Sequence, residues 1–395
     1  MNNDRFTLFN SILHALVGMA FSITIGFGNP ILASLGLNSS KIGIIFALSM
    51  IAGIFIQIGF SYIVENRRII TVIQCIRLEA ILSIIIGIIF VIAKNNNILA
   101  SISFLLALSL STSGFPTLGA LSVECLNAGE KLNFGLSRAM GSIGYSLFGF
   151  FGGYLISIVG ETFLFYPYIL LNVLIVLITF IHPKYVAIDI INETESDSII
   201  SMLTKNNQFR KLILGISLIF FSHNVINNFL KDIISYVNAN DIQYGIAVGL
   251  SSFLELPTLI LFGIIVKRFS NISLLRISAI FMSLKVIIET LATSFNGIVI
   301  AQFTQPLAFA LFTPAVIFYM NDIVKRGNQV KAQLMIGVAS MGIGGSLGNI
   351  IGGLLINTFG IRATLIISSI IAIVGAIIFM FLKDVKYKNN TVYNK

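Results

Sequence analysis

Residues 133–155 read NFGLSRAMGSIGYSLFGFFGGYL, an almost uncharged stretch with one arginine, Arg138. About 20 apolar residues are enough to cross a hydrocarbon core of about 30 Å as an α-helix. An arginine inside such a helix is costly, and ionisable residues within a membrane are by default functional. The stretch therefore predicts a membrane-spanning helix whose arginine has a specific task.

Composition extends this prediction to the whole chain. Of its 395 residues, 56% are hydrophobic and only 10% are charged, and the mean hydropathy is +0.95. A soluble domain carries about 25% charged residues. We therefore expect an all-α, multi-pass membrane protein. The apolar run from about Phe6 has no small-residue cleavage site, so it is expected to stay as the first helix.

The apolar runs predict twelve transmembrane helices in two pseudo-symmetric bundles of six. The expected spans are residues 7–28, 41–63, 69–93, 98–124, 134–158, 163–182, 211–235, 243–266, 272–294, 297–321, 331–356 and 361–383. One connection is long and polar, and it divides the spans evenly. We therefore expect an N-terminal bundle at 1–182, a cytoplasmic linker at 183–210 and a C-terminal bundle at 211–395.

The distribution of lysine and arginine predicts the orientation in the membrane. With the N-terminus inside, the outer segments hold only Lys41, Lys94, Lys231 and Arg362. Arg138 and Lys285 fall within spans, and the other basic residues all fall in inner segments. Because cytoplasmic loops are rich in Lys and Arg, both termini are expected in the cytoplasm. The net charge of +9 is thus a membrane signal, and no nucleic-acid partner is expected.

The two halves of the chain resemble each other. A shift of 200 residues aligns the glycine pairs Gly144/Gly344, Gly152/Gly352, Gly153/Gly353 and Gly160/Gly360. A shift of 202 pairs Gly43 with Gly245, which fits a small insertion in a loop. Two parallel repeats are typical of transporters whose substrate site lies at the midplane between the halves.

Two loops carry a related motif. Residues 263–268, GIIVKR, and residues 61–68, SYIVENRR, occupy equivalent positions in the two halves. Both resemble, in degenerate form, the Gly-x-x-x-Asp-Arg loop signature of the major facilitator superfamily, with Lys267 and Glu65 in place of the aspartate. The alternative is that both are ordinary positively charged flanks. The resemblance implies the twelve-helix fold of secondary transporters.

The stretch around Arg138 resembles the fifth-helix motif of the lactose permease group, the oligosaccharide–proton symporters of this superfamily. In that motif an arginine is followed by glycine-x-x-glycine and an aromatic residue, as in residues 138–145, RAMGSIGY. The resemblance implies that Arg138 binds sugar hydroxyls, that Tyr145 stacks on the sugar ring and that Ser142 lines the site. The family's fourth-helix glutamate corresponds to Glu124.

The resemblance continues in the second half. Lys285 stands at the family's essential ninth-helix arginine, and Glu255 at its eighth-helix glutamate. Gln305 and Ala308 stand where the family has the tenth-helix histidine and glutamate that bind sugar and carry the proton. The proton-carrying carboxylate is therefore absent from its family position, and Gln305 is expected to contact the substrate.

The charged residues can also be interpreted without the resemblance. Glu124 and Arg138 lie in neighbouring spans, and pairing would lower the cost of burying them. Such a pair either steadies the helices or faces the substrate, and arginine's planar fork of donors suits a substrate role. Lys285 and Glu289 lie one turn apart, so Glu255 and Glu289 can share one ammonium. We expect Glu255 to carry the coupling proton, because a desolvated carboxylate protonates readily; a static network is the alternative.

These observations predict a secondary active transporter of the cytoplasmic membrane. It would import a small polar solute, a sugar or oligosaccharide, by alternating access with proton coupling, and sodium stays open as the coupling ion. The main alternative is a proton-driven efflux transporter for drugs or sugars, which would tolerate loss of Arg138. We see no aspartate-rich metal motif, nucleophile–histidine pair or phosphate loop, so no enzyme, metal site or cofactor is expected. A monomer without a disulfide between Cys75 and Cys125 is expected.

Overall fold

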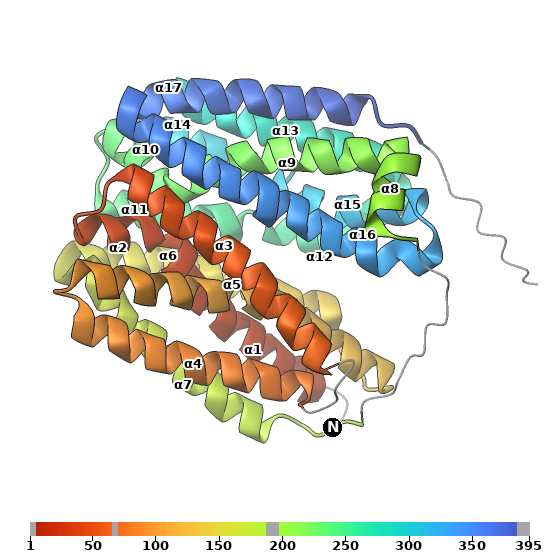
Figure 1. The fold of residues 1–395 in the computed structure, drawn as a ribbon, viewed down its shortest axis with the longest axis horizontal. Helices are drawn as coiled ribbons and strands as arrows, with labels where there is room; N and C mark the ends of the chain where they lie inside the picture. Colours follow the sequence, from red (N-terminus) through yellow and green to blue (C-terminus); the bar gives the residue numbers. More distant parts are fainter. Residues whose placement is uncertain (1–4, 65–69, 187–196, 385–395) are drawn as a thin grey trace, which may run out of the picture.

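The computed structural model describes residues 5–64, 70–186 and 197–384, and its secondary structure there is helical. Figure 1 shows two groups of long helices that run side by side, the first half of the chain below and the second half above. The first half consists of α1 (Arg5–Phe21), the π-helical η1 (Ser22–Gly26), α2 (Gly28–Ser34), α3 (Ser39–Tyr62), α4 (Val72–Ala93), α5 (Asn97–Asn127), α6 (Phe134–Val159), the 3-10 helix η3 (Glu161–Leu164) and α7 (Phe165–Ile181).

The second half contains more short helices than the first. It consists of α8 (Ile199–Lys205), α9 (Asn207–Asn228), α10 (Leu230–Tyr236), α11 (Asp241–Phe253), α12 (Leu256–Arg268), α13 (Asn271–Leu291), α14 (Phe295–Gln302), α15 (Phe309–Ile323), the 3-10 helix η4 (Arg326–Asn328), α16 (Gln329–Gly337), the π-helical η5 (Val338–Gly345) and α17 (Ser346–Met380). Several of these short helices come from predicted spans that are interrupted.

Ten helical stretches in the described residues are long and apolar enough to cross a membrane. The last of them, Gln329–Met380, is broken at Gly360, whose φ of 79° and ψ of 170° are not helical. Two spans were predicted on either side of that point. Another predicted span is represented by α15, which is apolar but shorter. The all-helical membrane class is thus confirmed, whereas the count of twelve and the cytoplasmic termini stay predictions.

The outer surface of the bundle is apolar. Large side chains such as Phe55, Ile92 and Ile98 are 69%, 78% and 75% exposed. A soluble monomer rarely exposes extended apolar surface, because water penalises it. Surrounding lipid removes that penalty, so the surface fits a protein embedded in a bilayer.

Polar side chains begin several of the long helices. Asn96 accepts a hydrogen bond from the Leu99 amide at 3.2 Å, and Asn133 accepts one from the Leu136 amide at 3.0 Å. Each bond satisfies an N–H that has no partner within the helix. Short loops can therefore connect long apolar helices without leaving these amides unpaired.

The aligned glycines occupy matching positions in the two halves. A Cβ at Gly144 would overlap the backbone of α1, and one at Gly344 would overlap the backbone of α9. Gly160 and Gly360 both end a helix at a positive φ, 84° and 79°, which favours glycine. The repeat seen in the sequence thus corresponds to equivalent packing, while the boundaries of the predicted units stay a prediction.

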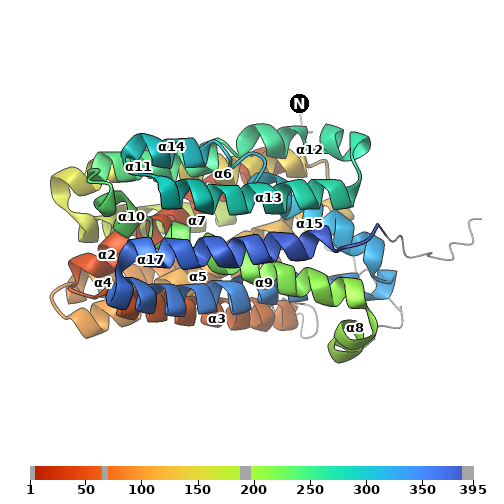
Figure 2. The same cartoon turned by 90° about the horizontal axis from the view of Figure 1, so that it is seen from above.

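The two halves contact each other closely at one end of the helices. The Asp232 carboxylate, near the start of α10, accepts hydrogen bonds from Asn29 at 2.7 Å and from Ser39 at 3.1 Å. Along α6 and α11, a Cβ on Gly153 would lie 2.5 Å from the Cα of Gly245. Figure 2 shows α3 of the first half lying alongside α17 of the second. In the predicted orientation this closed end is the outer one.

The predicted linker is partly helical, which the sequence analysis missed. Residues 187–196 of the linker lie outside the described residues, and so do residues 65–68 of the first loop motif. In the described part of the linker, α8 spans Ile199–Lys205 and α9 begins at Asn207. Asn328 donates to the Asp197 carboxylate at 2.7 Å, and the Lys325 ammonium lies 3.4 Å from it. These two contacts lower the pKa of Asp197 below its ordinary value. They fasten the start of α8 to the segment between α15 and α16.

Candidate substrate and coupling site

Two helix breaks place polar residues at the interior of the second half. The predicted span 243–266 is interrupted at residues 254–255, between α11 and α12, and Pro257 follows directly. The predicted span 297–321 is interrupted at residues 303–308, which include Pro306. Proline removes a backbone donor and clashes with the preceding turn, so it interrupts a helix. The first predicted span is found as one membrane-long stretch, Asp241–Arg268, with a turn inside it, whereas the second is divided and only the shorter α15 remains as an apolar helix.

The two breaks are joined by side-chain hydrogen bonds. Gln305 lies in the second break, and its Nε2 donates to Oε1 of Glu255, in the first break, at 2.9 Å. The Lys285 ammonium, on α13, donates to Oε1 of Gln305, also at 2.9 Å. Lys285 is only 1% exposed, and Gln305 is buried. The amide of Gln305 therefore holds a carboxylate at one end and an ammonium at the other.

Glu289 extends this network by one helical turn. It is buried, and its Oε1 accepts a hydrogen bond from Gln302 at 3.4 Å. Its Oε2 has no hydrogen-bond partner in the described structure. Neither Glu289 nor Glu255 lies within 4.0 Å of the Lys285 ammonium, so the predicted sharing of that ammonium is indirect. The amide of Gln305 lies between the Lys285 ammonium and the Glu255 carboxylate.

Arg138 and Tyr145 approach this network from the first half. Arg138 is half-buried on α6, with its guanidinium carbon 5.0 Å from the centre of the Phe115 ring. Glu255 is the carboxylate close enough to interact electrostatically with Arg138, and it also lies near Tyr145. Within the described residues Arg138 makes no hydrogen bond or ion pair. Its donors are therefore available to a bound molecule.

The predicted pair between Glu124 and Arg138 is not formed. The Tyr185 hydroxyl, just after α7, donates a hydrogen bond to Glu124 instead. Glu124 lies in the last turn of α5, one end of the helix bundle, whereas Arg138 is one turn inside α6. Because Glu124 and Arg138 lie at different depths, the carboxylate of Glu124 bonds the nearer Tyr185 instead of Arg138. A role of Glu124 in substrate binding stays a prediction.

Ser142 lies at the contact between the halves. Its backbone carbonyl accepts a hydrogen bond from Ser252 of α11 at 3.1 Å, and its side chain is buried. The residue therefore joins α6 to α11 directly above the break that holds Glu255. Its role as part of a substrate site stays a prediction.

Some polar residues escaped the sequence analysis. His223 of α9 stacks on Phe309, with ring centres 4.9 Å apart, at the start of α15. Its ring lies close enough to Lys285 to interact electrostatically, so α9 also faces the network. The two prolines after Glu255 and Gln305 were the available signal, because proline within an apolar run marks an interrupted helix. The pairing of the breaks had no signal in the sequence.

Interrupted helices at the junction of two repeated halves, with charged side chains on both sides, define a class of protein. This is the architecture of secondary transporters with inverted or parallel repeats. Residues 19–390 match the MFS_1 like family, and the chain belongs to that family. The family comprises membrane transporters of the major facilitator superfamily rather than enzymes. A multi-pass membrane location and a small-molecule substrate follow from this membership.

Solved structures agree with this fold. A mutant of the nucleoside transporter NupG superposes with a TM-score of 0.79 at 15% sequence identity, covering 95% of this chain and 99% of that one. A second NupG structure gives a TM-score of 0.74 at 15% identity, with 96% and 98% covered. A bacterial homologue of the human lysosomal transporter Spinster, in an inward-facing and occupied conformation, gives 0.67 at 13% identity, with 97% and 98% covered. No curated protein matches the sequence.

Proposed function

We propose that this protein imports a small hydroxylated solute, a sugar or oligosaccharide, together with a proton across the cytoplasmic membrane. The observation that carries the proposal is the Glu255–Gln305–Lys285 network. Its Glu255 and Gln305 lie in two helix breaks, its Lys285 lies on α13, and Glu255 interacts electrostatically with Arg138 of the other half. A carboxylate, an ammonium and a guanidinium thus meet where a transporter of this fold binds its cargo.

The substrate-binding part of the proposal rests on Arg138 and Tyr145. The guanidinium of Arg138 has five donors in a planar fork, and the described structure gives none of them a hydrogen-bonded partner. Hydroxyl groups of a sugar are suitable acceptors for such a fork. Tyr145 is half-buried two turns further along α6 and offers an aromatic face to a ring. The resemblance to the lactose permease group supports the same assignment.

The coupling part rests on Glu255. An ionised Glu255 accepts the hydrogen bond from Gln305 and attracts Arg138 across the junction. A proton on this carboxylate removes the attraction, which frees Arg138 for substrate and loosens one link between the halves. Protonation and substrate binding then favour the same state, which is the requirement for coupled transport. Lys285 keeps the amide of Gln305 in the orientation that serves Glu255.

The decisive experiment is charge movement in proteoliposomes of the purified protein. Sugars, nucleosides and aromatic acids are added rapidly at several pH values. Nucleosides belong in the panel because they contain a hydroxylated ribose and because NupG is by name a nucleoside transporter. A sustained, pH-dependent current with one glycoside is expected. Arg138→Ala should lower the affinity roughly 10- to 150-fold, since a hydrogen bond to a charged group contributes about 1.5–3 kcal/mol.

Two controls separate the roles in this assay. Arg210→Ala removes an exposed arginine whose hydrogen bond to Asn207 stays within one helix, and it should leave transport unchanged. Glu255→Gln should abolish proton-driven accumulation but keep exchange of substrate for substrate. If Glu255→Gln leaves the coupling intact, the proton-carrier assignment is wrong. Proton-driven export of lipophilic compounds that survives Arg138→Ala would instead identify an efflux transporter.

A further inference from the structure

A second buried carboxylate lies in the first half, away from the network described above. Glu79 of α4 is only 6% exposed. Its Oε1 accepts hydrogen bonds from Ser113 at 2.6 Å and from Thr117 at 3.2 Å, both on α5. Its Oε2 accepts no hydrogen bond from any described residue. One oxygen of this carboxylate is therefore held in place while the other is left available.

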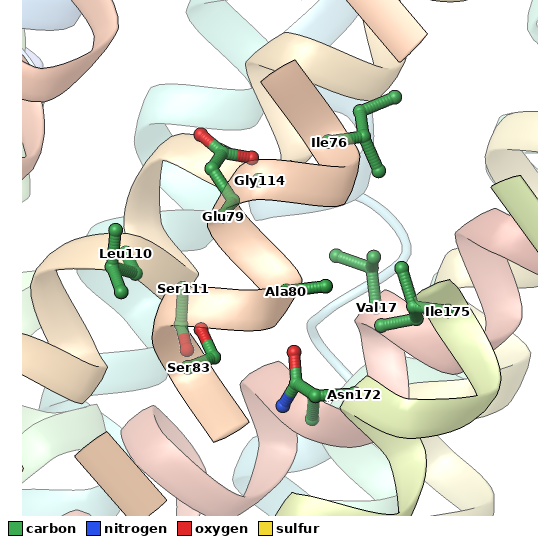
Figure 3. Close-up of a pocket in the computed structure, with 11 residues that line it drawn as sticks. Val17, Ile76, Glu79, Ala80, Ser83, Leu110, Ser111, Gly114, Asn172 and Ile175 are labelled. Atoms are coloured by element: carbon green, nitrogen blue, oxygen red, sulfur yellow. The ribbon is translucent and has the colours of Figure 1, made fainter. Parts of the chain in front are cut away.

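A small cavity adjoins Glu79. Its volume is about 30 Å³, and α1, α4, α5 and α7 surround it. Besides Glu79, the polar residues that line it are Ser83, Ser111 and Asn172 (Figure 3). The amide nitrogen of Asn172 already donates to the Tyr168 carbonyl at 2.9 Å, which leaves its side-chain oxygen for another donor. A space of this size with several polar partners holds one or two water molecules.

The charged and titratable groups around Glu79 supply no compensating cation. On α4, Cys75 lies one turn away, and Arg77 turns outward to bond Thr179 and cover Phe180. Of the neighbouring helices, α7 contributes Tyr168, which lies close enough to Glu79 to interact with it electrostatically. None of the described lysines or arginines lies within 4.0 Å of Glu79. An unpaired charge is too costly at such a site, so the carboxylate needs a small cation from solvent.

We propose that Glu79 is a second proton-binding site of this protein, served by water in the cavity beside it and separate from Glu255. The proton forms an O–H bond at Oε2, while Oε1 keeps its hydroxyl donors. A metal ion such as Na⁺ would need several oxygens around one point. Figure 3 instead shows the Glu79 carboxyl pointing away from the group formed by Ser83, Ser111 and Asn172. A proton needs only one open carboxylate oxygen, and Oε2 of Glu79 is such an oxygen.

Infrared difference spectroscopy of the purified protein tests this site without any substrate. A protonated buried carboxyl gives a C=O stretching band distinct from that of a carboxylate. A band of this kind that titrates with pH is expected in the wild-type protein and in Glu161→Gln, a matched control at a partly exposed glutamate. Glu79→Gln should lack it, and Glu255→Gln should retain it. A spectrum unchanged by Glu79→Gln overturns the proposal.

Two further experiments test the role of the cavity water and the alternative of a bound sodium ion. If Glu79→Gln does not fold, Asn172→Leu replaces it, because leucine fills the cavity while Glu79 stays. A shift in the pH midpoint of the Glu79 band is then expected, and an unshifted band overturns the role of the water. Melting temperatures in NaCl and in choline chloride test for sodium. A stabilisation specific to NaCl that Glu79→Gln abolishes would make this a sodium site and overturn the proton assignment. No arm depends on transport, so a failed transport assay leaves this test valid.

Discussion

Gln305 has an unusual position for an uncharged residue. It stands where the resembling family has a histidine, and its amide joins a half-buried carboxylate to a buried ammonium. An amide can do this because it contains a donor and an acceptor at opposite sides. Buried charges are tolerated only when their hydrogen-bonding capacity is satisfied. Gln305 thus makes it possible for Glu255 and Lys285 to coexist in the protein interior.

Replacing Gln305 should lower the stability of the protein and also impair its transport activity. Gln305→Leu leaves Glu255 and Lys285 without their hydrogen bonds, which costs about 1–3 kcal/mol for each unsatisfied group. We expect a lower melting temperature of the purified protein, together with loss of pH-dependent transport. Gln57→Leu is the matched control, since Gln57 is half-buried on α3 and makes no hydrogen bond in the described structure. An unchanged melting temperature in Gln305→Leu would show that the network contributes nothing to stability.

At the scale of the elements, the helix breaks determine where the polar side chains of the candidate site lie. A continuous helix through residues 254–255 would have all its backbone groups paired internally. Glu255 lies in the interruption before Pro257, where it accepts a hydrogen bond from Gln305 of the other break. Irregular backbone at membrane depth persists where it is buried in protein or lines a water-filled space. The Gln305 side chain, which joins the two breaks, is buried.

Replacing Pro257 should weaken the coupling of transport to protons more than it lowers the stability of the protein. Pro257→Ala restores a backbone donor and allows α11 to continue into α12, which turns Glu255 away from Gln305. We expect weaker coupling in the transport assay with near-normal expression and melting. Pro116→Ala is the control, because Pro116 lies inside α5, which stays continuous there. Equal effects of both substitutions would mean that the break at 254–255 has no special role.

At the scale of the whole molecule, the two halves form a closed end and a less connected end. One group of the hydrogen bonds that join them in the described residues lies at the start of α3 and of α10, around Asp232, and others lie further along the helices, from Ser252 to the Ser142 carbonyl and from Ser346 to the Ala47 carbonyl. The glycines of α6 and α11 let the same ends approach closely. A transporter must break such contacts to open that side. The rest of this interface is packed through small and apolar residues, α6 against α11 and α3 against α17, so opening this side also has to separate those helices.

Asp232→Ala should shift the protein toward a form open at this end. The substitution removes the acceptor for both Asn29 and Ser39, which lie on the other half. We expect faster labelling by a membrane-impermeant thiol reagent at an introduced Tyr244→Cys, since Tyr244 is buried at the closed end. Asp241→Ala is the control, because Asp241 pairs with Lys231 within the same half. Equal labelling rates in the two variants would contradict this assignment of the closing contacts.

Much of the architecture was predictable from local patterns. Apolar runs, asparagine caps and glycines at helix ends act over a few residues, so the membrane helices and the repeat were visible in the sequence. The interruptions in the spans 243–266 and 297–321 were missed because an apolar run looks continuous even where Pro257 and Pro306 divide it. Glu79 is buried against α5, which no local pattern of the sequence indicated. Its hydroxyl partners lie more than thirty residues away in the chain.

The sequence by itself determined that this chain is a helical membrane protein built from a repeat, because hydrophobicity and periodicity are properties of neighbouring residues. It also singled out Arg138, Glu255, Lys285 and Gln305 as candidates, because isolated polar groups in apolar runs are conspicuous. Only the tertiary structure decided which of them meet. Gln305 forms hydrogen bonds with both Glu255 and Lys285. Glu124 accepts a hydrogen bond from Tyr185 and does not pair with Arg138. Such partners are chosen by helix packing and by the depth of each side chain, which depend on contacts between residues far apart in the chain.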